Sequence, residues 1–218
     1  MKIKYQRPRG TQDLLPDYME KWNYIEGIWR SIATIFGYRE IVTPMFEHTE
    51  LFARGAGDTS DIVSKEMYTF LDRADRSISL RPEGTSAVVR AYLENNLTEW
   101  VQPVKLFYLV PMFRYEKPQA GRFRQHTQYG VEVIGSAAPF TDAEVIKLVL
   151  MFYEKLKIQG IKLHLNSVGD EMCRPVYHAK LKEYLESVSA SLCKDCQGRL
   201  ERNPLRVMDC KQHSVKSY

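Results

Sequence analysis

Apolar residues recur at helical spacing in the first part of the chain, between Asp17 and Phe36. These residues are Trp22, Ile25, Ile28, Trp29, Ile32, Ile35 and Phe36. Intervals of three and four residues place them on one side of a helix, so the pattern predicts an amphipathic helix over this range. Asp17 and Glu20 have the spacing of a capping box at its start, and Gly37 follows where a helix-ending glycine belongs.

Three later segments also predict helices. They are "SAVVRAYLENN" at 86–96, "TDAEVIKLVLMFYEKLK" at 141–157 and "RPVYHAKLKEYLESVSASL" at 174–192. Thr85 stands near the start of the first of them. Thr141 and Glu144 have the spacing of a second capping box, which places a helix start at the beginning of the second.

Alternating or continuously apolar segments predict the strands. A short strand is expected before Pro44, with an irregular segment after it, and further strands at 67–70 and 76–80. The segments "VKLFYLVPMFRYE" (104–116) and "RQHTQYGVEVIG" (124–135) predict two strands joined by a charged turn, and "IKLHLNSVG" (161–169) predicts another. Hairpins and long helices occur without regular βαβ alternation. The order therefore predicts an α+β fold, with an antiparallel sheet flanked by helices.

The second strand of the hairpin has two chemically different faces, because side chains alternate along a strand. One face carries Tyr129, Val131 and Val133, and the other carries Gln128, Gly130, Glu132 and Ile134. The first set is typical of a core face. In the second set a glycine lies between an amide and a carboxylate, which predicts a polar depression with open space for a small polar ligand. The alternative is an exposed sheet face that tolerates a glycine.

Composition and charge say little about the binding partners of the protein and somewhat more about its compartment. The 218 residues carry a net charge of +4, which permits contact with nucleic acid without arguing for it. The N-terminal "MKIKYQRPRG" has no apolar run of the kind found in secretory signals, and the longest apolar stretch, "VIKLVLMF", is too short to span a bilayer. Four cysteines, three of them near the end, do not suggest a disulfide framework. We expect a reduced, cytoplasmic setting and no membrane.

The turn between the two hairpin strands concentrates positive charge. Arg114, Lys117, Arg122 and Arg124 face a single nearby carboxylate, Glu116. Such cations repel one another unless an anion or a nucleic-acid backbone lies among them, and the planar guanidinium group can pair with two oxygens at once. The alternative is a solvated basic hairpin tip.

The segment "RPEGT" places a carboxylate and a hydroxyl at the start of a predicted helix. Glu83 and Thr85, separated by Gly84, could together hold an ammonium group. The alternative is that Glu83 is simply a favourable partner of the helix dipole.

Cysteines and a histidine near the end have the spacing of metal ligands. Cys193 and Cys196 form a Cys-x2-Cys pair, and Cys210 and His213 repeat that interval after a gap of 13 residues, which matches a small tetrahedral zinc site. The alternative is three reduced thiols and a surface histidine. We expect the alternative, and hence no metal.

Several long motifs together resemble bacterial histidyl-tRNA synthetase, a class II aminoacyl-tRNA synthetase. They are "RPRGTQDLLP", "YREIVTPMFEHTELFARG", "KEMYTF", "LRPEGTSAVVRA", "PMFRYEKPQAGRFRQHTQYGVEVIG" and "DAEV". The resemblance extends to about Lys211. It implies that the charged turn is the family's motif 2, whose loop handles ATP and the tRNA acceptor end. It also implies that Pro44 and the helix before it form motif 1, which builds a homodimer interface.

The resemblance also implies roles for individual residues. Histidine would be bound by Glu83, Gly84, Thr85, Arg114, Gln128 and Glu132, with Glu132 on the imidazole side. Arg114 would be the catalytic arginine on the α-phosphate and the amino acid carboxylate. ATP, with Mg²⁺ as its substrate complex, would also meet Glu116 near the adenine and Arg122 at the outer phosphates. The family usually has an aromatic residue, typically Phe, where His126 stands; we expect the imidazole to stack on the adenine instead.

Parts of the family pattern have no counterpart in the chain. Residues 1–170 resemble the N-terminal part of the catalytic domain, with motifs 1 and 2, and 171–218 resemble the start of an insertion region. Neither motif 3 nor the anticodon-binding domain is matched, so we expect an incomplete sheet and a truncated form of the ligase that is inactive alone.

Two alternatives to a ligase stay open at this point. One is a synthetase-like, histidine-sensing regulatory subunit of ATP phosphoribosyltransferase, a class that tends to lose the residues that handle ATP. The other is a degenerate product with a dimerising role only.

Overall fold

The computed structural model describes residues 5–56, 66–117, 119, 121–167 and 169–210. The chain separates into two compact units, Met1–Ile161 and Lys162–Tyr218, and each is described by itself. The predicted boundary after residue 170 concerns motif and insertion regions of the family and stays a prediction. Within the described residues, no helix is long and apolar enough to cross a membrane.

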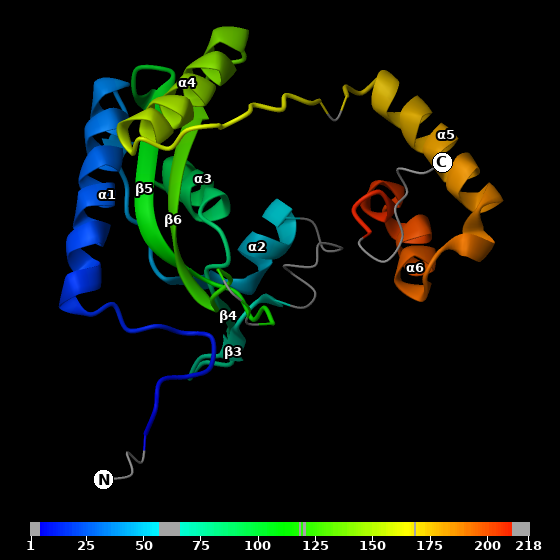
Figure 1. Ribbon diagram of the computed structural model, residues 1–218, viewed down its shortest axis with the longest axis horizontal. Coiled ribbons are helices and arrows are strands. Elements are labelled where there is room, and N and C mark those ends of the chain that lie inside the picture. Colours follow the sequence, from blue (N-terminus) through cyan, green and yellow to red (C-terminus); the bar gives the residue numbers. More distant parts are fainter. Residues whose placement is uncertain (1–4, 57–65, 118, 120, 168, 211–218) are drawn as a thin grey trace. The chain divides into compact units, whose positions relative to one another are not determined.

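The first unit is built on a long antiparallel hairpin (Figure 1). Strands β5 (Val104–Phe113) and β6 (Gln125–Ile134) pair over their whole length, from Val104 opposite Ile134 to Phe113 opposite Gln125. The short strand β1 (Arg39–Glu40) pairs in parallel with β5 on its other side. The predicted α+β fold and the predicted hairpin are both confirmed.

Helices α1 (Pro16–Ile35) and α4 (Pro139–Lys155) cover one face of this sheet. The buried residues between them and the sheet are Trp29, Ile32, Ala33, Tyr38, Phe107, Leu148 and Phe152. Tyr129, Val131 and Val133 of β6 pack against this cluster. Alternation along β6 therefore predicted its core face correctly.

Helix α3 (Thr85–Glu94) and the 3-10 turn η2 (Leu97–Glu99) cover the other face. The buried residues of this second cluster are Val88, Tyr92, Leu97, Val104, Leu106, Tyr108, Val110 and Met112. Three β5 members of this cluster, Leu106, Val110 and Met112, pair with polar residues of β6, which are Glu132, Gln128 and His126. Apolar and polar side chains therefore share one face of the hairpin.

A small second sheet and one further helix complete the first unit. Strands β2 (Phe46–His48), β4 (Ser77–Leu80) and β3 (Thr69–Leu71) are antiparallel in the order β2-β4-β3. Helix α2 (Thr49–Ala56) follows β2 directly. The sequence interpretation of this stretch as irregular was wrong. Helix α2 is only two turns long and begins at the residue after β2, so neither element is long enough to show a clear period in the sequence.

The second unit consists of helices around a small apolar cluster. Its elements are α5 (Cys173–Ser187), η3 (Ser189–Ser191), α6 (Lys194–Arg202) and η4 (Pro204–Val207). Leu181, Leu185, Leu192, Cys196, Leu200 and Val207 form the buried cluster.

Other local predictions also differ from the structure. Neither predicted capping box forms: α1 begins after Leu15 and α4 after Ala138, without a side-chain cap, and each has proline at its start. Proline lacks the N–H that a cap would satisfy and pre-sets the helical φ, so it fixes these starts. The strand expected at 161–169 is wrong, because its described residues belong to no strand. A pattern of alternating apolar residues does not make a strand without a neighbour to pair with.

Candidate active site

Four polar side chains meet on the face of the hairpin that looks toward α3. Thr85 Oγ1 donates to Glu132 Oε1 at 2.8 Å, and the Tyr108 hydroxyl donates to the same oxygen at 3.4 Å. Gln128 Nε2 donates to the Tyr108 hydroxyl at 3.3 Å. Of the predicted histidine-binding residues, the structure therefore links Thr85 to Glu132 directly and Gln128 to Glu132 through Tyr108.

Tyr108 was not singled out in the sequence, and it corrects the predicted shape of the site. It pairs with Gly130 across the hairpin and is only 3% exposed. A Cβ atom added at Gly130 would lie 2.1 Å from Tyr108 Cζ, and one added at Gly84 would lie 2.4 Å from it. Both glycines make room for this ring, so the expected open space at Gly130 is filled.

Glu83 lies at the start of α3 and accepts two backbone hydrogen bonds. Its carboxylate oxygens accept from the N–H groups of Thr85 at 2.6 Å and Ser86 at 3.0 Å. Glu83 therefore does interact with the N-terminus of helix α3, as the alternative interpretation of the sequence expected. The same geometry holds the carboxylate beside Thr85, which in turn contacts Glu132.

The two carboxylates give the site an excess of negative charge. In the described part of the chain neither Glu83 nor Glu132 forms an ion pair. Burial raises the pKa of Glu132; hydrogen bonds from Thr85 and Tyr108 oppose this rise, and the charge of Glu83 adds to it. Burial, followed by the charge of Glu132, also raises the pKa of Tyr108. A cationic group placed among these side chains would relieve the unfavourable burial of negative charge.

An open groove of about 1010 Å³ includes Thr85, one member of this cluster, in its lining. Its lining comes from α2 and α3, together with Glu83. Its lining combines the apolar side chains of Leu51, Val89 and Leu93 with polar and charged ones, which are Arg54, Glu83, Thr85, Ser86, Arg90 and Glu94. The groove gives a small ligand a way to approach the first turn of α3 from solvent.

Arg114 stands where β5 ends, beside the segment that carries Glu83. Its Nε donates to the Pro82 carbonyl at 2.8 Å, and its backbone N–H donates to the Arg124 carbonyl at 2.9 Å. Burial, followed by the positive charge of Arg114, lowers the pKa of His126. His126 is therefore held as a neutral imidazole close to this arginine at neutral pH.

Two further loop cations, Arg122 and Arg124, have partners within the chain. Arg122 Nη1 pairs with Glu116 Oε2 at 3.3 Å. The guanidinium of Arg124 lies 3.8 Å above the ring of Tyr115, and its backbone N–H donates to the Gly10 carbonyl at 2.7 Å. The loop therefore holds the N-terminal segment in place. A hollow of about 330 Å³ lies between that segment and the loop.

Arg81 is a buried structural residue that the sequence did not reveal. It is 1% exposed, and its guanidinium donates to the carbonyls of Thr43 at 2.7 Å, Pro111 at 2.8 Å and Pro44 at 3.3 Å. Burial lowers its pKa. Because these carbonyls come from segments 30 or more residues away, no local pattern could have indicated them. Arg81 fixes the strand that leads into Pro82 and Glu83.

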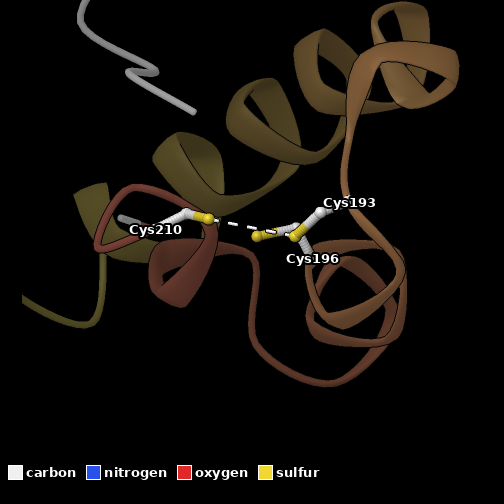
Figure 2. A group of neighbouring side chains, drawn as sticks. All are labelled: Cys193, Cys196 and Cys210. Carbon is white, nitrogen blue, oxygen red and sulfur yellow. Dashed lines mark hydrogen bonds between the residues drawn. The ribbon is translucent and has the colours of Figure 1, made fainter. Parts of the chain in front are cut away.

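The second unit brings the three late cysteines together (Figure 2). The sulfur atoms of Cys193, Cys196 and Cys210 all lie within 4.8 Å of one another. Cys196 is fully buried, and burial, with added effects of Cys210 and Cys193, raises its pKa to about 12. His213, the fourth residue of the predicted pattern, lies outside the described residues.

The sequence of this chain matches a known family over most of its length. The family model described as histidyl-tRNA synthetase matches residues 10–186. The chain belongs to the histidyl-tRNA synthetase family. The resemblance found in the motifs is thereby confirmed.

Individual members of the histidyl-tRNA synthetase family are close in sequence. Histidine--tRNA ligase of Desulforamulus reducens is 59% identical over 210 residues, which are 96% of this chain and 50% of that protein. Histidine--tRNA ligase of Moorella thermoacetica is 60% identical over 205 residues, or 94% of this chain and 48% of that protein. The chain thus spans about half the length of the curated relatives it matches.

Solved structures agree with this assignment. The apo histidyl-tRNA synthetase of S. aureus matches with a TM-score of 0.74 and 45% identity, over 93% of this chain and 48% of that one. A Bacillus halodurans protein described as an ATP phosphoribosyltransferase regulatory subunit/histidyl-tRNA synthetase matches with a TM-score of 0.66 and 23% identity, over 92% of this chain and 55% of that one. The second likeness shows the fold alone.

Proposed function

We propose that this chain supplies the histidine- and ATP-binding part of a histidine–tRNA ligase. The observation that carries the proposal is the polar cluster around Glu132, with Arg114 nearby, in a chain 59% identical to histidine--tRNA ligases. The proposed partners are L-histidine, ATP with Mg²⁺ as its substrate complex, and histidine tRNA. The reaction class is that of an aminoacyl-tRNA ligase.

Histidine binds at the start of α3, against the polar face of β6. Its ammonium group is held by the carboxylate of Glu83 and the hydroxyl of Thr85, and Gly84 keeps this turn free of a side chain. Glu132 and Gln128 lie on the imidazole side, where their hydrogen bonds to Thr85 and Tyr108 orient them. Two carboxylates without ion-pair partners among the described residues suit a ligand that brings positive charge.

Arg114 acts on the reacting groups. A histidine carboxylate oxygen attacks the α-phosphorus of ATP, the bond to the β-phosphate oxygen breaks, and pyrophosphate leaves. Arg114 stabilises the charge on the α-phosphate and the incoming carboxylate. Glu116 and His126 contact the adenine, and Arg122 leaves Glu116 to meet the outer phosphates. A hydroxyl at the tRNA end then attacks the activated carbonyl and releases AMP.

The wider setting follows the family. Motif 1, formed by α1 and the segment through Pro44, contributes to a homodimer, and the loop after β5 contacts the tRNA acceptor end. The setting is cytoplasmic. For the 218-residue chain by itself we expect binding without turnover, because no segment matches motif 3 with its second ATP-binding arginine.

The regulatory-subunit alternative is less well supported. Its structural relative shares 23% identity, and that likeness supports the fold alone. Arg114, Glu116 and Arg122 are all present, which favours a ligase over a subunit that has given up ATP.

Calorimetric titration with L-histidine and with L-histidinol, which lacks the carboxylate, tests the role of Arg114. We expect the chain to prefer histidine, and Arg114→Ala to weaken histidine binding about tenfold or more and to erase the preference, since a charge-assisted hydrogen bond contributes about 1.5–3 kcal/mol. Arg73→Ala, at an exposed arginine, is the matched control. Equal binding of both compounds by the unaltered chain would contradict the proposal.

A further inference from the structure

The cysteine cluster of the second unit is independent of the histidine site. Cys193 is the N-cap residue of α6, Cys196 lies in the first turn of that helix, and Cys210 follows η4. Two segments that are separate in the sequence therefore bring their sulfur atoms to one point (Figure 2). We propose that these three cysteines form a structural Zn²⁺ site, with each thiol giving up its proton to bind as thiolate.

The distances between the sulfur atoms fit a shared metal ion. Cys193 Sγ and Cys210 Sγ are 3.9 Å apart, and all three sulfur atoms lie within 4.8 Å of one another. Tetrahedral zinc with Zn–S bonds of about 2.3 Å places its sulfur ligands about 3.8 Å apart. Only a small inward movement of the side chains is needed to reach that geometry. A disulfide would require about 2.05 Å, and none of these three cysteines is part of a disulfide.

The start of helix α6 favours negative charge at the cysteine cluster. Cys196 lies in the first turn of α6, where the positive end of the helix dipole favours negative charge. Lys194 and Asp195 lie between the two cysteines of the Cys-x2-Cys pair, and their opposite charges add no net charge beside the cluster. The metal would connect the start of α6 to the residue Cys210 after η4. The small apolar cluster that contains Leu200 and Val207 also packs these two segments together.

Three reduced thiols packed as small apolar side chains are the competing explanation. That explanation accounts for the burial of Cys196 and for the packing of Cys193 and Cys210 against the apolar cluster, but it does not require all three sulfur atoms to lie within 4.8 Å of one another. Cys173, in the same unit, provides the contrast: it is exposed and outside the cluster. His213 lies outside the described residues, so the proposal rests on the three sulfur atoms alone.

Metal analysis of the purified 218-residue chain tests the proposal. The chain is prepared under reducing conditions with zinc and dialysed against a weak chelator, and zinc is then counted per chain by mass spectrometry. We expect one tightly held zinc ion in the unaltered chain and in the matched control Cys173→Ser. Cys193→Ser and Cys210→Ser should weaken zinc binding by more than about 100-fold, since each removes a metal ligand.

Cobalt substitution gives a second readout that needs no variant. Co²⁺ in a tetrahedral thiolate site should show intense visible bands and a sulfur-to-metal charge-transfer band, and zinc should displace both. Cys196 is fully buried, so its serine variant can lose zinc simply by unfolding; the variants Cys193→Ser and Cys210→Ser, at half-buried positions, are used instead. An unaltered chain that retains no zinc, a cobalt spectrum without the charge-transfer band, or equal zinc loss in Cys173→Ser would each overturn the proposal.

Discussion

The ring of Tyr108 occupies the space that a side chain at position 130 would fill. The two residues are paired across the β5–β6 hairpin, and a Cβ atom at Gly130 would lie 2.3 Å from the Tyr108 hydroxyl oxygen. That hydroxyl contacts both Gln128 and Glu132. The glycine is thus needed to place the tyrosine that hydrogen-bonds to Gln128 and Glu132 in the proposed histidine site.

Gly130→Ala should therefore damage both stability and binding. The added methyl group meets a buried ring, and overpacking of this kind costs about 1–3 kcal/mol in the free energy of unfolding. Because the displaced hydroxyl no longer orients Gln128 and Glu132, histidine affinity should fall as well. Urea denaturation and calorimetric titration measure the two effects.

Gly27→Ala is the control for that substitution. A Cβ atom at Gly27 in α1 would meet nothing within 4 Å, and alanine is a better helix former than glycine by about 1 kcal/mol. We expect this variant to be as stable as the unaltered chain or more so. Equal stability of Gly130→Ala and Gly27→Ala would show that Tyr108 does not depend on the glycine.

Stability should depend on pH through Glu132. Burial raises its pKa in the folded state, so protonation of Glu132 favours folding. This contribution is fully present below the ordinary glutamate pKa and is lost as pH rises through the raised pKa of Glu132. Glu132→Gln cannot titrate, yet its amide oxygen can still accept from Thr85.

The difference in unfolding free energy between Glu132→Gln and the unaltered chain isolates this effect, because all other titrating groups cancel. We expect the difference to grow in favour of the variant as pH rises from the ordinary glutamate pKa toward neutrality. Urea titrations at a series of pH values measure it. A difference in unfolding free energy that does not change with pH would mean that burial does not raise the pKa of Glu132.

Arg81→Met should be among the most destabilising single changes in the first unit. It leaves the carbonyls of Thr43, Pro44 and Pro111 without their shared donor, and each buried acceptor left unsatisfied costs about 1–3 kcal/mol. We expect a loss of on the order of 3 kcal/mol by chemical denaturation. Arg73→Met, at an exposed position, should change stability little. Comparable effects of the two changes would contradict the structural role of Arg81.

The sequence predicted the parts of this fold that short-range periodicity decides. Alternation along β6 separated Val131 and Val133 from Gln128 and Glu132 correctly, since the period of a strand is set by its own backbone. Helical spacing likewise predicted α1, and Gly37 ends it with a φ of +78°.

The sequence did not reveal those features of the fold and the site that depend on contacts between residues far apart in the chain. Tyr108 belongs to the site because of its register with Gly130, and register cannot be read from either strand alone. Arg81 is buried by carbonyls from two other parts of the chain. The Cys-x2-Cys spacing was visible in the sequence, but only the fold brings Cys210 within reach of it.

The affinity of the chain for L-histidine, compared between the unaltered protein and Glu132→Gln, is the sharpest test of the proposed histidine site. We expect measurable, selective histidine binding at neutral pH that weakens by about 10- to 100-fold in the variant, because one charge-assisted contact is lost. Glu154→Gln, at an exposed position of α4, should bind as the unaltered chain does. An unaltered chain with no preference for histidine over other amino acids, or a Glu132→Gln variant with undiminished affinity, would contradict the proposed site.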